Sequence, residues 1–403
     1  MKVLFVSADG FFYNNSSAIQ NIGIICGLKD LGAEIDLLTL QSQEGTIGFD
    51  HAIEDASKKY LQQVYFVPLN HLYKKINKQK KLVVENTGKE RRWYTWVKGK
   101  IRRNIKKFLI FDLRILNLSG LNDISIDLSQ YDFIISASDP KSTHCFANAL
   151  IRKGNFRGKY IQYWGDPLYM DITRDKSVID GLYKIAERKV LQGADKIVYA
   201  TPFTLREQQN LYPEYANRMI YAHQAAMKLE THESKMTEKD DDKKFSIVYC
   251  GDYRKETRNI MPLYSAVKKM NRDVRLDIYG TSNVNLSDEN NITIHGQVSR
   301  EKADIAENNA DVLFCICNLK GSQIPGKIYY LTEYKKNIII AVDGEYKDEL
   351  QTYFENMKRF IVCQNKEHEI IKAIDKARKM DRNVHYNKDE FSPKKMSEKI
   401  IYG

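Results

Sequence analysis

The sequence predicts an α/β protein of two domains, each a doubly wound parallel sheet with helices on its faces. The chain opens with an apolar strand, Lys2–Ser7, followed by a helix over 22–31 and a second strand over 34–39. A βα pattern begins again at Phe245–Cys250. At 403 residues the chain is also too long for one ordinary core. We therefore expect two domains with right-handed crossovers.

A polar, charge-dense stretch over 227–244 predicts a linker between the two domains. The expected N-terminal domain spans 1–226, with a basic insertion at about 70–125, and the C-terminal domain spans 245–385. Residues 386–403 are expected to form a helix that packs back on the N-terminal domain.

The composition is that of a globular protein, with 43% hydrophobic and 29% charged residues. The six cysteines lack the paired spacing of metal ligands and lie mostly in apolar runs, so we expect reduced thiols and no metal. We expect neither a signal peptide nor a run of about 18 apolar residues that would span a bilayer. The expected location is cytoplasmic.

One segment makes the chain basic. Residues 74–107 carry 14 Lys and Arg against Glu85 and Glu90, whereas the whole chain has a formal charge of +11. From Trp93 to Leu109, apolar residues recur every three or four positions, which is typical of a basic amphipathic helix. Such a helix either lies peripherally on an anionic membrane, gaining about 1 kcal/mol per basic residue, or packs on a domain. Nucleic acid is a weaker alternative, because the segment contains no recognised nucleic-acid module.

Polar residues follow the predicted strands of the first domain. Ser16 and Ser17 stand before the first helix, where small residues either admit a phosphate or cap the helix. Asp139 and His144 follow a strand at 131–136. A lone histidine is more often a cap or a core residue, but parallel strands end at one edge, where neighbouring acids favour a site.

The next strand of the first domain ends in Trp164 and Asp166. These residues are expected at the same edge as Asp139 and His144, since the strands are parallel. The sequence therefore predicts a site at the carboxyl edge of this sheet.

In the second domain, a cationic loop follows the strand Phe245–Cys250. It runs from Gly251 through Arg254 to Arg258 and suits a diphosphate. No G-x-G-x-x-G follows the first strand of either domain, which argues against a dinucleotide-dependent oxidoreductase.

A second loop in this domain, from Gly321 to Lys327, follows an apolar strand over 310–317 and precedes a helix expected from about Pro325. Helix N-termini at this edge of a parallel sheet bind anions through their N–H groups. The alternative is an ordinary crossover with a solvated lysine. The spacing alone favours neither the anion site nor the ordinary crossover.

These pieces resemble the GT-B glycosyltransferases, in which two Rossmann-like domains face a cleft. The likeness is greatest to family 4, the retaining, nucleotide-sugar-dependent group that builds bacterial surface polysaccharides. Residues 138–144 and 162–166 resemble the cleft loops of its first domain, and 249–259 resembles its diphosphate loop. Residues 324–331 and 336–341 resemble the segment (I/V)-P-(S/G)-K-(I/L)-F-E-Y-L-x-x-x-K-P-I-(I/L)-A.

The chain departs from that family pattern at the ribose-binding glutamate. Aligned on Lys327, its position holds Tyr330, with Glu333 three residues later as a possible substitute. The earlier glutamate of the pair would fall at Ser322. Recognition of the ribose is therefore expected to differ in detail.

The resemblance implies a sugar transfer from a nucleoside diphosphate sugar, such as a UDP- or GDP-sugar, to a saccharide or lipid-linked acceptor, without a metal. Arg258 and Lys327 would neutralise the departing diphosphate. His144 would meet the transferring sugar through its 6-hydroxyl, and Asp139 and Asp166 would position hydroxyls. The implied catalytic residues are His144, Asp166, Arg258 and Lys327. The implied donor contacts are Ser16, Ser17, Gly251, Arg254, Arg258, Gly296, Gln297, Val298, Ile324, Pro325, Gly326, Lys327, Tyr330 and Glu333, and the acceptor contacts are Asp139, Trp164 and Asp166.

Two alternatives stay open at this point. The missing glutamate pair fits a GT-B-like protein that binds nucleotide sugars without catalysis. A sugar-nucleotide epimerase shares the architecture and would convert the donor without an acceptor.

Overall fold

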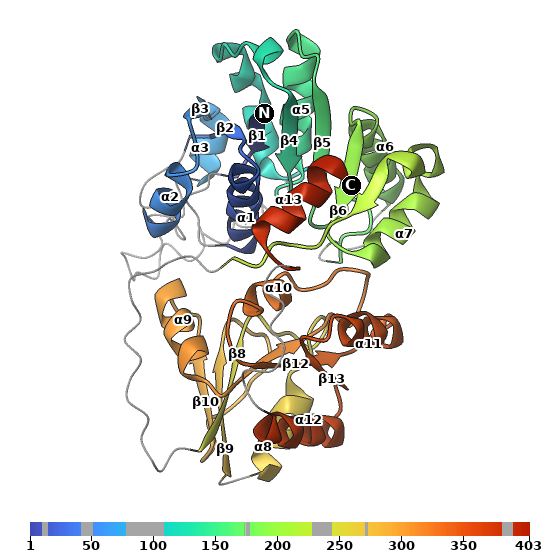
Figure 1. Ribbon diagram of the computed structural model, residues 1–403. Coiled ribbons are helices and arrows are strands. Elements are labelled where there is room, and N and C mark those ends of the chain that lie inside the picture. The colour runs from blue at the N-terminus through green and yellow to red at the C-terminus, as the bar shows by residue number, and fades with distance from the viewer. Residues whose placement is uncertain are drawn as a thin grey trace, which may run out of the picture. The chain divides into compact units, whose positions relative to one another are not determined.

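The computed structural model describes residues 1–9, 15–41, 51–77, 109–172, 174, 178–227, 244–270, 273–380 and 390–403. The chain divides into two compact units (Figure 1). Unit 1 comprises Met1–His223 with Pro393–Gly403, and unit 2 comprises Gln224–Ser392. Most of the basic segment 74–107 and of the linker 227–244 lies outside the described residues.

Unit 1 is built on a seven-stranded sheet in which every neighbouring pair is parallel. The strand order is β3-β2-β1-β4-β5-β6-β7. The strands are β1 (Lys2–Ser7), β2 (Glu34–Leu40), β3 (Gln63–Val67), β4 (Phe133–Ala137), β5 (Lys159–Trp164), β6 (Lys196–Tyr199) and β7 (Met219–Tyr221).

Helices and short 3₁₀ segments surround this sheet. The helices are α1 (Ser16–Asp30), α2 (His51–Lys58), α3 (His71–Asn77), α5 (Ser142–Lys153), α6 (Asp180–Leu191), α7 (Pro202–Leu211) and α13 (Pro393–Tyr402), and the 3₁₀ segments are η2 (Leu113–Asp123), η3 (Leu128–Gln130) and η4 (Pro213–Arg218).

The C-terminal helix α13 packs on α1 within unit 1. The hydroxyl of Ser397 donates to the carbonyl of Ile24 at 3.0 Å. A β-carbon at Gly27 would lie 1.9 Å from the carbonyl oxygen of Pro393, so α1 needs a glycine there for this close approach.

Unit 2 has a six-stranded parallel sheet of order β10-β9-β8-β11-β12-β13. Its strands are β8 (Phe245–Cys250), β9 (Val274–Tyr279), β10 (Ile292–Gly296), β11 (Val312–Ile316), β12 (Asn337–Val342) and β13 (Ile361–Gln364), and its helices are α8 (Met261–Met270), α9 (Arg300–Asn309), α10 (Lys327–Leu331), α11 (Lys347–Asn356) and α12 (Glu367–Lys379).

The predicted fold class is confirmed. It could be predicted because the buried strands are recognisable in the sequence. Parallel strands covered on both faces read as continuous apolar runs. In β1 the five residues after Lys2 are buried, and in β12 the five after Asn337 are buried. Each unit has its own apolar core, with Phe146 and Ile197 in unit 1 and Phe314 and Ile374 in unit 2 among its members.

Two predicted helices differ from the observed ones. The first begins at Ser16 instead of position 22, because Asn15 caps it. The helix expected from Pro325 begins at Lys327 and has only five residues. So short a helix adds little dipole, and the anion site predicted from its N-terminus loses that support.

The direction of strand order reverses once in each sheet, between β1 and β4 in unit 1 and between β8 and β11 in unit 2. In open α/β sheets ligands bind outside the carboxyl ends of the strands at this switch point. The loops after β1, β4, β8 and β11 therefore carry the candidate site residues.

Candidate functional site

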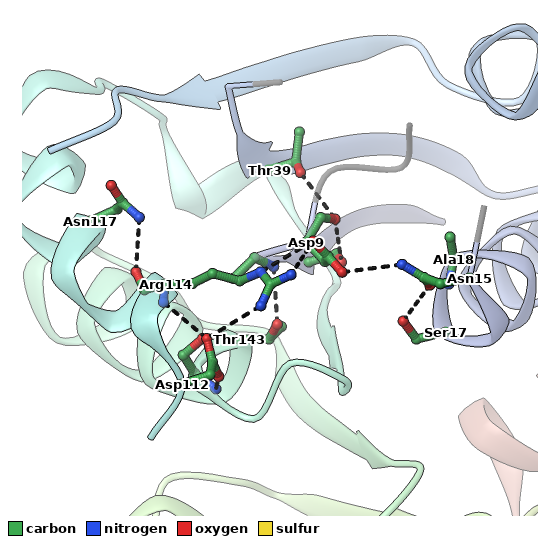
Figure 2. A network of polar contacts seen from close by, with 12 residues as sticks. Asp9, Asn15, Ser17, Ala18, Thr39, Asp112, Arg114, Asn117 and Thr143 are labelled. Carbon is green, nitrogen blue, oxygen red and sulfur yellow. Dashed lines mark hydrogen bonds and ion pairs between the residues drawn. The ribbon is translucent and has the colours of Figure 1, made fainter. Parts of the chain in front are cut away.

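At the switch point of unit 1, Asp9 after β1 is joined to Arg114 in η2 (Figure 2). The Nε and Nη2 atoms of Arg114 donate to Oδ1 of Asp9 at 3.1 and 2.7 Å. Asp112 lies on the other side of the guanidinium, with its Oδ1 3.8 Å from Nη1. Asp112 also accepts bonds from the backbone N–H and hydroxyl of Ser142, at the start of α5. Two carboxylates thus hold one arginine and tie three loops together.

The start of α1 joins the same network through Asn15. Its Oδ1 accepts from the N–H of Ala18 and from the hydroxyl of Ser17, both at 2.8 Å, and its Nδ2 donates to Oδ2 of Asp9 at 3.3 Å. The predicted donor contact Ser17 is therefore part of the helix cap, whereas Ser16 is exposed beside it.

A second cation held by carboxylates lies after β4. The ammonium of Lys141 lies 2.8 Å from Oδ1 of Asp139 and 2.5 Å from Oδ2 of Asp171. Burial alone would lower the pKa of Lys141, but these two acids and Asp166 together raise it above its ordinary value. The predicted residues Asp139 and Asp166 are thus brought together around a lysine that sequence reasoning left out.

His144 lies wholly inside unit 1, in the first turn of α5. Its Nδ1 is 2.7 Å from the hydroxyl of Ser136, which in turn is 2.8 Å from the hydroxyl of Tyr160. Among the described residues, its Nε2 has no hydrogen-bond partner. Burial, with a smaller effect of Lys141, lowers the pKa of His144 to about 3. The imidazole is therefore neutral at physiological pH, and suits hydrogen bonding better than proton exchange.

Trp164 packs against His144, with the ring centroids 4.0 Å apart. Its indole is fully buried and its Nε1 donates to Oε1 of Gln162 at 3.1 Å. The indole and the imidazole are both fully buried, so the predicted contacts of Trp164 with an acceptor and of His144 with a sugar stay predictions. Trp164 holds the histidine ring in place.

Sequence reasoning missed Glu187 on α6. Its carboxylate is fully buried and accepts from the N–H groups of Leu168 and Tyr169, at 2.6 and 3.2 Å, and from the hydroxyl of Tyr212 at 2.8 Å. Burial raises the pKa of Glu187. Glu187 thereby anchors the loop that carries Asp166, and no local sequence signal separates it from an ordinary surface glutamate.

At the switch point of unit 2, Arg258 is fixed by a neutral side chain. Its Nε donates to Oδ1 of Asn318 at 2.9 Å, and Nδ2 of Asn318 donates to the carbonyl of Gln323 at 2.9 Å. Backbone bonds between Arg254 and Arg258, at 2.9 and 3.2 Å, close the loop that bears both arginines. Within the described part of the chain, Arg258 forms no ion pair. The loops after β8 and β11 thus hold Arg258 in place through a neutral side chain, with no carboxylate of the described residues paired to it.

Close backbone approach shapes this loop. A β-carbon at Gly280 would lie 2.0 Å from the carbonyl oxygen of Gly251, and the N–H of Gly280 donates to the carbonyl of Gly296 at 2.7 Å. The predicted donor contacts Gly251 and Gly296 therefore lie close together at the ends of β8 and β10. Gln297 beyond them is exposed and Val298 is half-buried.

Lys327 is paired with Glu307 of α9, at 2.5 Å between Nζ and Oε1. A quarter of the lysine side chain is exposed, whereas Glu307 is buried. Burial would lower the pKa of Lys327, but Glu307 raises it. Lys327 is therefore a charged lysine whose field is largely offset by its partner.

Tyr330 belongs to the same cluster and is buried. Its hydroxyl lies 2.6 Å from Oδ1 of Asp304 and 2.7 Å from the hydroxyl of Tyr334, and Arg300 lies 4.1 Å above its ring. The prediction that Tyr330 contacts the donor does not fit this position. Its hydroxyl and ring belong to a buried cluster with Asp304, Tyr334 and Arg300. Glu333, three residues further along the chain, is half-buried.

Ile324, Pro325 and Gly326 lead into Lys327, and the first two are buried. A β-carbon at Gly326 would lie 1.9 Å from Oε1 of Gln224. A larger residue before the lysine would therefore require the Gln224 side chain to move.

No protein-family model matches the sequence, and no curated protein is detectably similar to it in sequence. Solved structures are similar along nearly the whole chain. The Anabaena protein HepE, solved with UDP and glucose, has a TM-score of 0.53 at 9% identity, over 99% of this chain and 95% of HepE. The lipopolysaccharide outer core galactosyltransferase WaaB has a TM-score of 0.53 at 11% identity, over 99% and 98%. A putative UDP-N-acetylglucosamine 2-epimerase from Listeria monocytogenes has a TM-score of 0.51 at 10% identity, over 98% and 93%.

The chain has the GT-B fold. At 9 to 11% identity the likeness concerns the fold alone, and transferases and an epimerase share it. Activity must therefore be argued from the side chains.

Two kinds of polar edge are available in this GT-B protein. Unit 1 offers carboxylates and one neutral imidazole, which suit hydroxyl groups, and unit 2 offers Arg258, Arg254 and Lys327, which suit phosphate oxygens. Over the described residues, no cluster of three His, Cys, Asp or Glu side chains has the arrangement of a metal site. No helix there has the length and apolar character needed to cross a membrane.

Proposed function

We propose that the protein is a glycosyltransferase that moves a sugar from a nucleoside diphosphate sugar to a saccharide or lipid-linked acceptor. The observation that carries the proposal is Arg258, which the neutral amide of Asn318 holds at the β8/β11 switch point and which no carboxylate of the described residues pairs. A fixed, uncompensated cation at this edge is what a departing diphosphate needs.

The donor is assigned to unit 2. Arg258 and Arg254 bind the diphosphate oxygens, and Lys327 adds its remaining N–H donors while Glu307 holds it. Gly251 and Gly296 leave room for the backbone to approach the nucleotide. Support comes from the shared fold with HepE, whose structure contains UDP and glucose.

The proposed reaction retains the anomeric configuration. The bond between the anomeric carbon and the diphosphate oxygen breaks, and the acceptor oxygen forms a new bond on the same face. The acceptor proton passes to the departing diphosphate oxygen, so charges and atoms balance without a metal. Negative charge develops on that oxygen in the transition state. The arginine side chains stabilise this charge and so lower the barrier.

The acceptor is assigned to unit 1. Asp139 and Asp166 accept hydrogen bonds from sugar hydroxyls, and we assign the transferring sugar to neutral His144, whose buried Nε2 has no hydrogen-bond partner among the described residues. The transferred group is a hexosyl or N-acetylhexosaminyl group, and the product belongs to a bacterial surface polysaccharide made at the cytoplasmic face of the membrane. The fold shared with WaaB, a lipopolysaccharide galactosyltransferase, supports this context.

Release of UDP or GDP from a panel of nucleotide sugars, with and without cell-envelope lipid, tests the proposal. Acceptor-dependent release supports transfer. Conversion of the donor sugar without release would instead establish an epimerase, the activity named for the Listeria structure. Calorimetric binding of a nucleotide sugar without either reaction would leave a binding protein and end the transferase proposal.

A further inference from the structure

Helix α6 of unit 1 carries an exposed apolar ridge. Leu182 and Ile185 are 50% and 61% exposed, and Val178, just before the helix, is fully exposed. Leu182 and Ile185 are three residues apart, which puts them on one side of the helix, and Val178 precedes its first residue, Asp180. Exposed aliphatic residues grouped in this way are costly in water unless something covers them.

The charges beside this ridge are basic. Lys184, Arg188 and Lys189 are exposed on α6, and Arg188 also pairs with Glu214 at 2.6 Å. The two acids of the helix are engaged elsewhere: Asp180 is bound by Arg174, and Glu187 is buried against backbone N–H groups. The ridge therefore presents aliphatic side chains flanked by lysines.

The ridge follows the proposed acceptor edge along the chain. α6 is the next helix after β5 (Figure 1), and Asp166 and Asp171 lie between these two elements in the sequence. Met170 in that loop is another exposed apolar residue, 38% accessible. Exposed apolar residues therefore occur both in the described part of this loop and on α6.

We propose that the α6 ridge lies on an anionic lipid bilayer, with Leu182, Ile185 and Val178 in the acyl boundary and Lys184 and Lys189 at the headgroups. An amphipathic helix with this division of side chains binds in the interface plane. The surface would bring the edge with Asp166 to the membrane, so the acceptor is a lipid-linked saccharide. This last clause rests on the proposed function, whereas the membrane contact does not.

Sedimentation of the full chain with vesicles tests the ridge. The vesicles contain phosphatidylcholine alone or with phosphatidylglycerol. We expect binding to the anionic vesicles, a loss of about tenfold in partitioning for Leu182→Gln with Ile185→Gln, and a loss of roughly fivefold per residue for Lys184→Gln and Lys189→Gln. The matched control, Met261→Gln with Met380→Gln, changes two apolar residues of unit 2 that are 40% and 37% exposed, and it should bind like the wild type.

Three outcomes would overturn the proposal. The ridge variants bind vesicles like the wild type; or they bind like the wild type but change the oligomeric state, which makes a second copy the occupant. In the third, they lower the melting temperature without lowering vesicle binding, which makes another part of this chain the cover. Vesicle binding needs no nucleotide sugar, so an absence of UDP or GDP release would refute the transferase and leave the membrane contact standing.

Discussion

The two switch points hold their cations in opposite ways. In unit 1, Arg114 lies between Asp9 and Asp112, and Lys141 lies between Asp139 and Asp171. In unit 2, a neutral amide orients Arg258. One parallel-sheet edge therefore keeps an excess of acids, and the other keeps a half-buried arginine that no carboxylate of the described residues pairs.

This difference shows that the side chain paired with a cation determines which ligand the cation can bind at that place in the fold. An arginine held by two carboxylates organises loops, and its charge is already neutralised. An arginine held by an amide is equally fixed but keeps its full attraction for phosphate. Lys327 is intermediate, since Glu307 holds it while a quarter of its side chain stays exposed.

The largest expected effect comes from removing the uncompensated charge. Arg258→Ala should lower kcat/KM by roughly 10²- to 10³-fold, because the departing diphosphate loses a preorganised donor. Steady-state kinetics with the best donor measures it. Arg114→Ala serves as the comparison and should act mainly on stability. Equal kinetic losses in the two variants would contradict the contrast between the two switch points.

Breaking the ion pair of Lys327 should have the next largest effect. Glu307→Gln leaves Lys327 without its buried carboxylate, while Arg300 keeps Asp304, and should cost about 3 kcal/mol of unfolding free energy. The pKa of Lys327 should fall, since burial lowers it and the raising influence of Glu307 is gone. Activity should therefore decline at a lower alkaline pH than in the wild type, as a pH profile of kcat/KM would show.

Converting one kind of switch point into the other is a sharper test. Asn318→Asp places a carboxylate beside Arg258, as in unit 1, and should weaken UDP binding by about 10-fold, or 1.4 kcal/mol. Calorimetry measures the affinity, and Asn122→Asp, at an exposed position of unit 1, controls for net charge. Unchanged affinity in Asn318→Asp would mean that Arg258 does not meet the diphosphate.

A separate prediction concerns the pH dependence of stability at His144. The folded protein takes up its proton near pH 3 and the unfolded chain near pH 6.5, so the stability it contributes is complete above pH 6.5. That stability is lost as the pH falls toward 3, at up to about 1.4 kcal/mol per pH unit. Urea unfolding between pH 7 and 4 should show a weaker pH dependence in His144→Gln than in the wild type. His71→Gln, at an exposed position, should keep the wild-type dependence.

Sequence reasoning recovered the strands well, because a strand buried on both faces leaves an unbroken apolar run. β1, β2 and β8 begin where they were predicted. It recovered the loops that hold candidate residues for the same reason, since the end of an apolar run marks the carboxyl edge.

The sequence pattern did not predict which residues are paired across the sheet. Asp9 and Arg114 are 105 residues apart, and Arg258 and Asn318 are 60 apart, so only the strand order brings each pair together. The position of a large side chain such as Tyr330 could not be predicted for a different reason. Tyr330 carries a polar group that a ligand could bind, but internal bonds satisfy it, and the periodic pattern cannot tell an inward side chain from one facing a ligand.

The helix α13 has a consequence for the order in which the protein forms. Its residues are synthesised after the whole of unit 2, yet their packing partner α1 lies near the start of the chain. During translation the face of α1 around Gly27 therefore lacks its partner α13 until about 360 further residues have been synthesised. Unit 1 thus closes last although it begins first, and unit 2 is in effect a domain inserted into it.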